Sequence, residues 1–247
     1  MPANTSPDNI EYPVPGDQIA PLNTKFQTLA ETTQDALTAN AGNGFRFRQT
    51  VRFTSSGTFA KADYPWLRAV RVKCVAPGAP GSGGDTADRG TAGGGAGETA
   101  ESWILVADLA ASEAVVVGAG PTCATGDTAP DDAPDTTFGS TKVVARGGDA
   151  SPSSGLLSPA GGTGGTGDFL VAGGGGGAGG ASGTPGGTGG ASSMGGGGGG
   201  GFASGVTSTN GSPGLAPGSG GGGAFRSGSD VAGGKGADGV VIVELFA

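Results

Sequence analysis

The feature that most constrains this chain is a glycine-rich stretch at 161–236. Between residues 173 and 236, 31 of 64 residues are glycine, and Asp168 is the only charged residue within 151–225. Such a stretch is either a flexible, solvated linker or a body of extended chains packed so closely that only glycine fits. Polyglycine-II helices are of the second kind. They have three residues per turn and no internal hydrogen bonds, so the backbone pairs with neighbouring chains.

The residues after the glycine-rich stretch favour the packed body. Only one strand-like segment remains there, the apolar nonapeptide GVVIVELFA, and nine residues cannot fold as a domain alone. The glycine runs also alternate with breaks that carry Ser, Thr, Pro and Asn, as turns do. Collagen is excluded because glycine does not recur at every third position. We therefore predict an ordered glycine-rich body at 161–236, closed by a strand at 238–246.

Charge and composition exclude several classes of function. The chain has 13 Lys and Arg against 21 Asp and Glu, a net charge of −8, which argues against nucleic acid as a partner. It has no histidine, which removes the commonest general base and metal ligand together with every Ser–His or Cys–His arrangement. Cys74 and Cys123 have no metal-ligand spacing, and they are either free and buried or joined in one disulfide.

The N-terminal region contains one helical pattern. Residues 1–16 are proline-rich and without periodicity, so they are a frayed tail or an extended docking arm. An amphipathic helix is predicted over 17–42, ending at the Gly-Asn-Gly sequence that comes next. Its apolar stripe needs a cover, either the domain after it or other copies of the chain in a trimeric coiled coil. The stripe consists of Ile19, Leu22, Phe26, Leu29, Thr33 and Ala36.

Residues 45–247 are predicted to form one mainly β domain with polyglycine-II-type helices. The segment FRFRQTVRF (45–53) alternates with period two, which places Phe45, Phe47, Val51 and Phe53 on one face. LRAVRVKCVAP (67–77) alternates in the same way, with Val70, Val72, Cys74 and Ala76 on one side. Further strands are expected in AESWILVADL, SEAVVVGAG and TTFGSTKVVARGG, and a short one in SSGTF.

Motifs for chemistry are weak in this sequence. The GxGxxG-like strings are too many to indicate a dinucleotide site, and Lys235 is followed by glycine where a phosphate-binding loop needs Ser or Thr. The acidic loop 127–135 could hold Ca²⁺, but its spacing fits no EF-hand. Glycan cleavage would need two carboxylates in a groove, for which Glu98, Glu101, Asp108 and Glu113 qualify by residue type only. We therefore expect no enzyme, cofactor or metal site.

Binding by loops remains as the expected activity, because a rigid scaffold commonly carries function on its connections. The breaks richest in recognisable side chains lie at 121–135, 150–158 and 202–217. Apolar residues exposed among Ser, Thr and Asn suit contact with a glycan or a surface protein. The alternative for each residue is that it fills a gap in the glycine core. The candidates are Asp127, Asp131, Asp132, Leu156, Leu157, Phe202, Val206, Asn210 and Leu215.

Several segments occur together along the chain: TSSGTF and VAPGAPGSGG, GGGAGETAESWILVADL before VVVGAGP, the runs GGGGGAGG, GGGGGGGFASG and GGGGAFRSG, and GGKGADGVVIVEL. On these segments the chain resembles glycine-rich tail proteins of tailed bacteriophages. The start, YPVPGDQIAPLNTKFQTLAETTQDAL, is similar to minor tail proteins of phages with high-GC Gram-positive hosts. The resemblance implies a component of the virion tail, in many cases a receptor-binding adhesin. Some of these adhesins form sandwiches of polyglycine-II helices and bind the host through loops.

Together these observations predict a minor tail protein or tail fibre in the virion that binds a host-cell glycan or protein without catalysis. We expect a homotrimer that docks on other tail or baseplate proteins through its N-terminus. No segment is apolar enough to insert in a membrane, and the N-terminus lacks the apolar core of a secretory signal, so synthesis in the host cytoplasm is expected. The alternatives are a purely structural tail-tip or decoration protein and a depolymerase of cell-envelope glycans.

Overall fold

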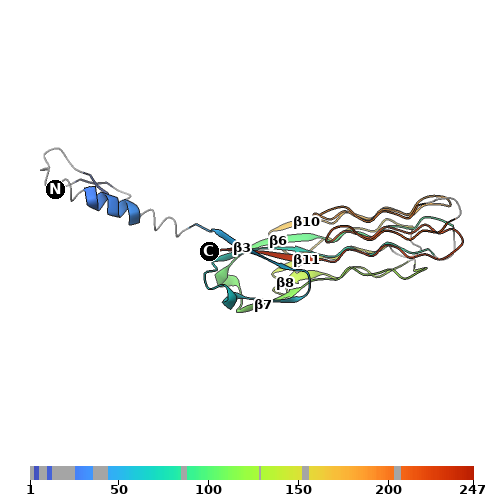
Figure 1. Cartoon of the computed structure of the whole chain (residues 1–247), viewed down its shortest axis with the longest axis horizontal. Coiled ribbons are helices and arrows are strands. Elements are labelled where there is room, and N and C mark those ends of the chain that lie inside the picture. Colours follow the sequence, from blue (N-terminus) through green and yellow to red (C-terminus); the bar gives the residue numbers. More distant parts are fainter. Residues whose placement is uncertain are drawn as a thin grey trace. The chain divides into compact units, whose positions relative to one another are not determined.

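The chain divides into two units, Met1–Arg46 and Phe47–Ala247 (Figure 1). The computed structural model describes residues 3–5, 10–12, 26–35, 44–84, 88–127, 129–151, 156–202 and 207–247. In the first unit, β1 (Ala3–Thr5) pairs antiparallel with β2 (Ile10–Tyr12), and residues 26–35 are helical.

The helical residues cover the middle of the predicted helix at 17–42. Phe26 is 55% exposed, Thr33 is exposed and Leu29 is half-buried. Ile19, Leu22 and Ala36 lie outside the described residues. These exposures refer to a single copy of the chain. That other copies cover the apolar stripe therefore stays a prediction.

The second unit contains two antiparallel sheets, which agrees with the mainly β prediction. The first sheet has the order β10 (Phe169–Val171), β6 (Thr99–Leu105), β5 (Ala69–Val75), β11 (Val240–Phe246) and β3 (Phe47–Phe53). The second has the order β4 (Gly57–Ala60), β7 (Ser112–Val116), β8 (Thr136–Phe138) and β9 (Val143–Ala145). Two 3₁₀ turns, Lys61–Asp63 and Val106–Asp108, complete this part of the chain.

The core lies between the two sheets and follows the period-two pattern of the strands. Val70, Val72 and Cys74 of β5 are fully buried in it, and Ala76 follows on the same side, as predicted. From the second sheet, Phe59, Val115, Phe138 and Val143 pack against them. The C-terminal strand β11 contributes Val241, Val243 and Leu245 and pairs on both edges, with β5 and with β3. The last strand is therefore an inner strand of the sheet, next to the edge strand β3.

Two strand predictions need correction. Phe47 was expected on the face of Val51 and Phe53, but a register shift beside Phe246 breaks the alternation. Phe47 lies opposite Phe246 on the outer face, with their ring centroids 5.9 Å apart. The segment TTFGSTKVVARGG was expected as one strand but forms β8 and β9. A turn separates them at Gly139 and Ser140, where φ is positive at both residues.

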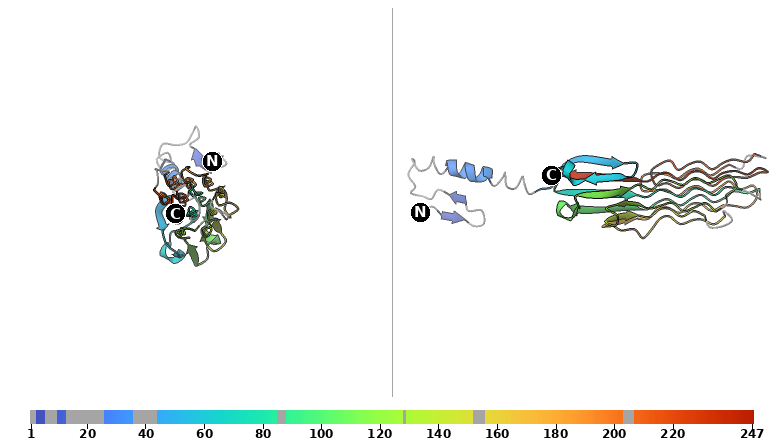
Figure 2. Two further views of the ribbon diagram at one scale, coloured as in Figure 1. Left: turned by 90° about the vertical axis from the view of Figure 1, so that its right-hand side faces the viewer. Right: turned by 90° about the horizontal axis from the view of Figure 1, so that it is seen from below.

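Beyond the sheets the chain travels outward and back in long, nearly parallel runs that carry no regular strand (Figures 1 and 2). Seen end-on in Figure 2, these runs pack side by side as a bundle. The outward runs are 76–84, 118–127, 145–151, 172–180, 195–202 and 218–226. The returning runs are 90–98, 129–135, 157–166, 184–192, 209–217 and 229–239.

Run 90–98 shows how the bundle is held together. Its amides point in turn to three neighbouring runs: Gly93 and Ala96 donate to 172–180, Gly94 and Gly97 to 218–226, and Gly95 and Glu98 to 145–151. Its carbonyl groups accept amides from three further runs, 76–84, 157–166 and 184–192. The run to which an amide donates thus repeats every three residues, and six neighbouring runs together supply the hydrogen-bond partners of this one run.

This packing explains the glycine content. A Cβ atom placed on Gly94 would lie 2.5 Å from the carbonyl oxygen of Pro80 and still closer to that of Ala79. Other glycines of the bundle meet neighbouring backbone in the same way. Gly196 differs, because a Cβ there would have nothing within 4 Å. Glycine is thus required where a neighbouring run lies against the residue.

Candidate functional site

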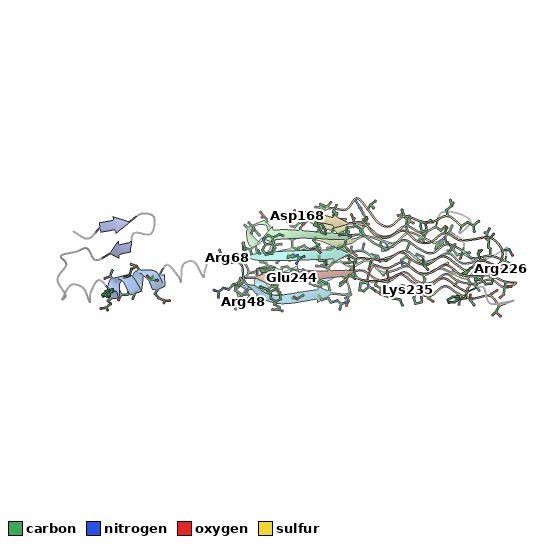
Figure 3. All side chains as sticks on the ribbon, turned by 90° about the horizontal axis from the view of Figure 1, so that it is seen from above. Arg48, Arg68, Asp168, Arg226, Lys235 and Glu244 are labelled. Carbon is green, nitrogen blue, oxygen red and sulfur yellow. The ribbon has the colours of Figure 1, made fainter. Side chains whose placement is uncertain are left out.

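The turns at the far ends of the runs gather at one end of the bundle, opposite the sheets (Figures 1 and 3). Backbone bonds connect these turns: the Gly179 amide donates to Leu156, the Gly180 amide donates to Gly90, and Phe225 pairs with both Gly90 and Thr209. Val231 pairs with Gly84 and accepts the Gly126 amide. We call this the distal end, made of residues 84, 88–90, 124–127, 156–157, 180–184, 202, 207–210 and 226–231.

Several predicted loop residues meet at the distal end. Phe202 is 75% exposed and Leu157 is 60% exposed, while Leu156 is half-buried. Asn210 is exposed, and its Oδ1 accepts the Ala232 amide at 3.0 Å. Val206 lies outside the described residues. The distal end therefore presents apolar side chains to solvent on turns that hydrogen bonds hold in place.

Leu215 lies elsewhere. It is 78% exposed, but its turn at 214–219 lies next to the sheets. Within that turn, Gly218 accepts the Gly97 amide and donates to the carbonyl of Asp238, just before β11. The structure therefore places Leu215 at the opposite end of the runs from Leu157, Phe202 and Asn210.

The three acidic candidates differ in their exposure and in the backbone amides that their side chains accept. Asp127 is half-buried, and its Oδ1 accepts the Ala129 amide at 3.1 Å while its carbonyl accepts the Gly83 amide at 2.6 Å. Asp131 and Asp132 are exposed and line a groove of about 530 Å³. The Asp127 carboxylate thus stabilises a turn, and the Asp132 carboxylate joins two runs, because its Oδ1 accepts the Ala150 amide at 2.7 Å.

The groove runs along the flank of the bundle. It is lined by 129–132, 149–151 and 158–160 and continues into a hollow of about 310 Å³, where Arg146 pairs with Asp135. Burial and the nearby charge of Asp132 raise the pKa of Asp149, a residue that sequence reasoning missed. The groove is rich in hydrogen-bond acceptors. Within the residues that the structure describes, no three acidic, His or Cys side chains gather to hold a metal ion.

An ion-pair cluster fixes two distal turns relative to each other. The Arg226 guanidinium, labelled in Figure 3, contacts Asp88 Oδ1 and Asp230 Oδ1 at 3.2 Å each. Asp88 Oδ1 also accepts the Gly228 amide at 2.8 Å. The Arg226 side chain is only 15% exposed, so its charge is shielded and paired. Sequence reasoning did not single out Arg226.

Three of the four carboxylates considered for glycan cleavage, Glu98, Glu101 and Glu113, have backbone or ion-pair partners, whereas Asp108 is exposed. Glu98 is buried, and its Oε2 accepts the amides of Arg146 at 3.1 Å and Gly165 at 2.9 Å. Glu113 is buried and accepts the Ala110 amide at 2.7 Å. Glu101 contacts Lys73 at 2.8 Å on the outer face of the first sheet. These contacts account for the three carboxylates as parts of the scaffold.

Both cysteines are free and buried, so the alternative of a disulfide is wrong. Burial raises the pKa of the Cys74 thiol to about 12, and burial also raises that of Cys123. In the described parts of the chain, no helix has the length and apolarity needed to cross a membrane.

Comparison with known proteins gives one assignment. A family model described as a glycine-rich domain matches residues 54–246, which include the runs and every strand of the two sheets except β3. The chain therefore belongs to this glycine-rich domain family. A search of curated proteins found no match.

Proposed function

We propose that this glycine-rich domain protein is a non-catalytic attachment component of a bacteriophage tail, which binds a host-cell surface through its distal end. One observation carries the proposal. The described residues of turns from distant parts of the sequence are gathered on one end of a bundle whose runs are rich in glycine and other small residues. Exposed apolar residues, Leu157 and Phe202, lie at that end.

We further propose that the runs are polyglycine-II-type helices. The support is the three-residue repeat of the hydrogen bonds of run 90–98 and its bonding to surrounding runs, both of which that helix requires. A scaffold whose backbone is bonded in this way loses little conformational freedom on binding. The contacts of its turns therefore contribute more fully to affinity.

The partner we propose is a glycan or a protein of the host surface. Leu157 and Phe202 offer apolar contact, and the flank groove with Asp131, Asp132 and Asp149 offers acceptors for hydroxyl or amide groups. We propose that residues 1–46 attach the chain to other tail proteins and that the helix at 17–42 gathers three copies. Several copies on one particle multiply individually weak contacts into avidity.

The test is the binding of labelled full-length protein to a panel of high-GC Gram-positive cells. Phe202→Ser and Leu157→Ser are expected to weaken saturable binding by about tenfold together. Leu215→Ser is the matched control, because Leu215 is as exposed as Phe202 but lies at the other end of the runs. Absence of saturable binding to any host that the parent phage infects would contradict the proposal, as would equal losses from Leu215→Ser and Phe202→Ser.

A further inference from the structure

The outer face of the first sheet is covered over only part of its area. Near the glycine runs, the turn at 192–195 lies over it: Ser193 Oγ is 2.6 Å from Thr99 Oγ1, and Met194 lines a small hollow with Lys73 and Ile242. Elsewhere on this face, from Phe169 on the edge strand β10 to Phe47 on the opposite edge strand β3, large apolar side chains are exposed instead. Their exposed fractions are 58% for Phe47, 42% for Trp103, 45% for Leu105 and 60% for Phe169.

These side chains are held in place by one another. Phe246 lies between two of them, with its ring centroid 4.6 Å from that of Trp103 and 5.9 Å from that of Phe47. The strand register places Ala69 between Leu105 and Phe246, and this small residue leaves room for the indole to reach across β5. The exposed ring of Trp103 is thus supported by packing.

A hollow of about 170 Å³ lies between Trp103 and Phe169. Asp168 also lines it, and its Oδ2 accepts the Trp103 amide at 2.9 Å (Figure 3). The floor carries an ion-pair network in which Glu101 contacts Arg71 at 2.7 Å and Lys73 at 2.8 Å, while Arg71 also contacts Glu244 at 3.5 Å. The hollow therefore combines two aromatic walls with charged groups at fixed positions.

We propose that this hollow binds an uncharged carbohydrate, with one sugar ring between Trp103 and Phe169. Aromatic rings attract the C–H faces of a sugar, and the fixed guanidinium and carboxylate groups can exchange hydrogen bonds with its hydroxyls. Arg71, which lines the hollow, and Lys73, which lies beside Glu101 next to it, are both already paired with carboxylates. No surplus positive charge is available there to attract an anionic polymer.

The size of the patch favours a small ligand over a second copy of the chain. The four exposed side chains offer together roughly 400 Å², at 150–250 Å² for each large residue. A stable interface between proteins needs about 800 Å² on each partner. The hollow is also smaller than a typical drug-sized pocket of about 300 Å³ or more, so it suits a single ring of a longer glycan.

This site does not depend on the function proposed for the distal end. Asp168 and Glu244 lie on the sheet, whereas Arg226 lies at the far end of the runs (Figure 3). Variants at Phe202 and Leu157 are therefore expected to leave sugar binding unchanged, and variants in the hollow to leave the distal turns intact. The failure of one proposal can be distinguished from the failure of the other.

The experiment is calorimetric titration of the full chain with neutral di- to tetrasaccharides of glucose, galactose, mannose and N-acetylglucosamine. Oligosaccharides that contain glucuronic acid serve as the anionic comparison. We expect at least one neutral sugar to bind with a Kd of about millimolar or tighter. Trp103→Ala and Phe169→Ala are each expected to weaken that binding about tenfold.

Leu105→Ala is the matched control, because Leu105 is exposed on the same strand but does not line the hollow. Asp168→Asn keeps an oxygen for the Trp103 amide and is expected to weaken binding severalfold while preserving the fold, which circular dichroism checks. Binding of none of the neutral sugars would overturn the proposal. Tighter binding of the anionic sugars would also overturn it, as would a Trp103→Ala variant that binds normally or changes the oligomeric state in sedimentation.

Discussion

A single methyl group added inside the bundle should be far more damaging than the same group added at its surface. Gly94 and Gly196 provide the comparison, because neither has positive φ, so alanine fits the backbone conformation of both. At Gly94 the methyl group would meet the carbonyl oxygens of Pro80 and Ala79. At Gly196 it would have nothing within 4 Å.

The size of the effect at Gly94 depends on the bonds around it. Relief of the collision requires run 76–84 to move away, which lengthens the bond from the Ala79 amide to Gly95 at 2.9 Å and that from the Gly221 amide to Ala79 at 3.0 Å. Loss of two such bonds costs about 2 kcal/mol, and overpacking adds about 1–3 kcal/mol. Restriction of the unfolded chain by alanine offsets about 0.4–1 kcal/mol.

Gly94→Ala is therefore expected to lower the free energy of unfolding by about 2–5 kcal/mol, a large part of the roughly 5–15 kcal/mol of a typical domain. Gly196→Ala is expected to change it by less than about 1 kcal/mol, in the stabilising direction. Urea unfolding followed by circular dichroism measures both, with equal m-values as the check that one transition is compared. Equal stability of the two variants would refute the close-packed bundle.

Three further outcomes are expected. Glu98→Ala leaves two part-buried amides without their acceptor and should lower the unfolding free energy by about 2–4 kcal/mol in urea, while Glu98→Gln, which keeps an oxygen, should lose less. Burial opposes ionisation of Glu101, but its bonds to Lys73 and Arg71 lower its pKa overall. The ionised Glu101 therefore stabilises the folded state above the pKa of the unfolded chain, and this stabilisation is lost as pH falls through the pKa of the folded state. Glu101→Gln should therefore be less stable than the parent at pH 7 and equal to it at about pH 2 in denaturant titrations. Cys74 and Cys123 should not react with Ellman's reagent until the chain unfolds, and labelling of the native protein would contradict their burial.

The strands were predictable where one face of a strand is buried over its whole length. Val70, Val72 and Cys74 alternate with polar residues, and only one register puts them in the core. Phe47 was misplaced because the register shift depends on Phe246, almost two hundred residues away. β10 was missed because its three residues are too few for a pattern, and only its pairing with β6 makes it a strand.

The distal end was partly predictable because breaks in the glycine runs are turns. Leu157 and Phe202 were found in this way, but the end of the bundle at which each turn lies was not considered. Since the runs travel alternately outward and back, successive turns lie alternately at the distal end and next to the sheets. The distal turn at 180–184 is followed by the turn at 192–195 next to the sheets and by the distal turn that includes residues 202 and 207–209. The turn of Leu215 comes after these and therefore lies next to the sheets. Asp149 was missed because it joins Asp132 only through packing of separate runs.

The three-residue repeat also explains residues that look out of place in a glycine bundle. In run 76–84, one row of amides (76, 79, 82) donates to run 90–98 and a second row (78, 81, 84) donates to run 229–239. Pro77 and Pro80 lie in the third row, so their missing N–H groups interrupt neither set of bonds. In this run the row that bonds to run 229–239 is all glycine, and the two prolines lie in the row whose third member, Gly83, donates to Asp127 instead. Because the bonds described for run 90–98 join backbone atoms only, side chains of the distal turns contribute nothing to them. Those turns can therefore change in sequence while the bundle that carries them is preserved.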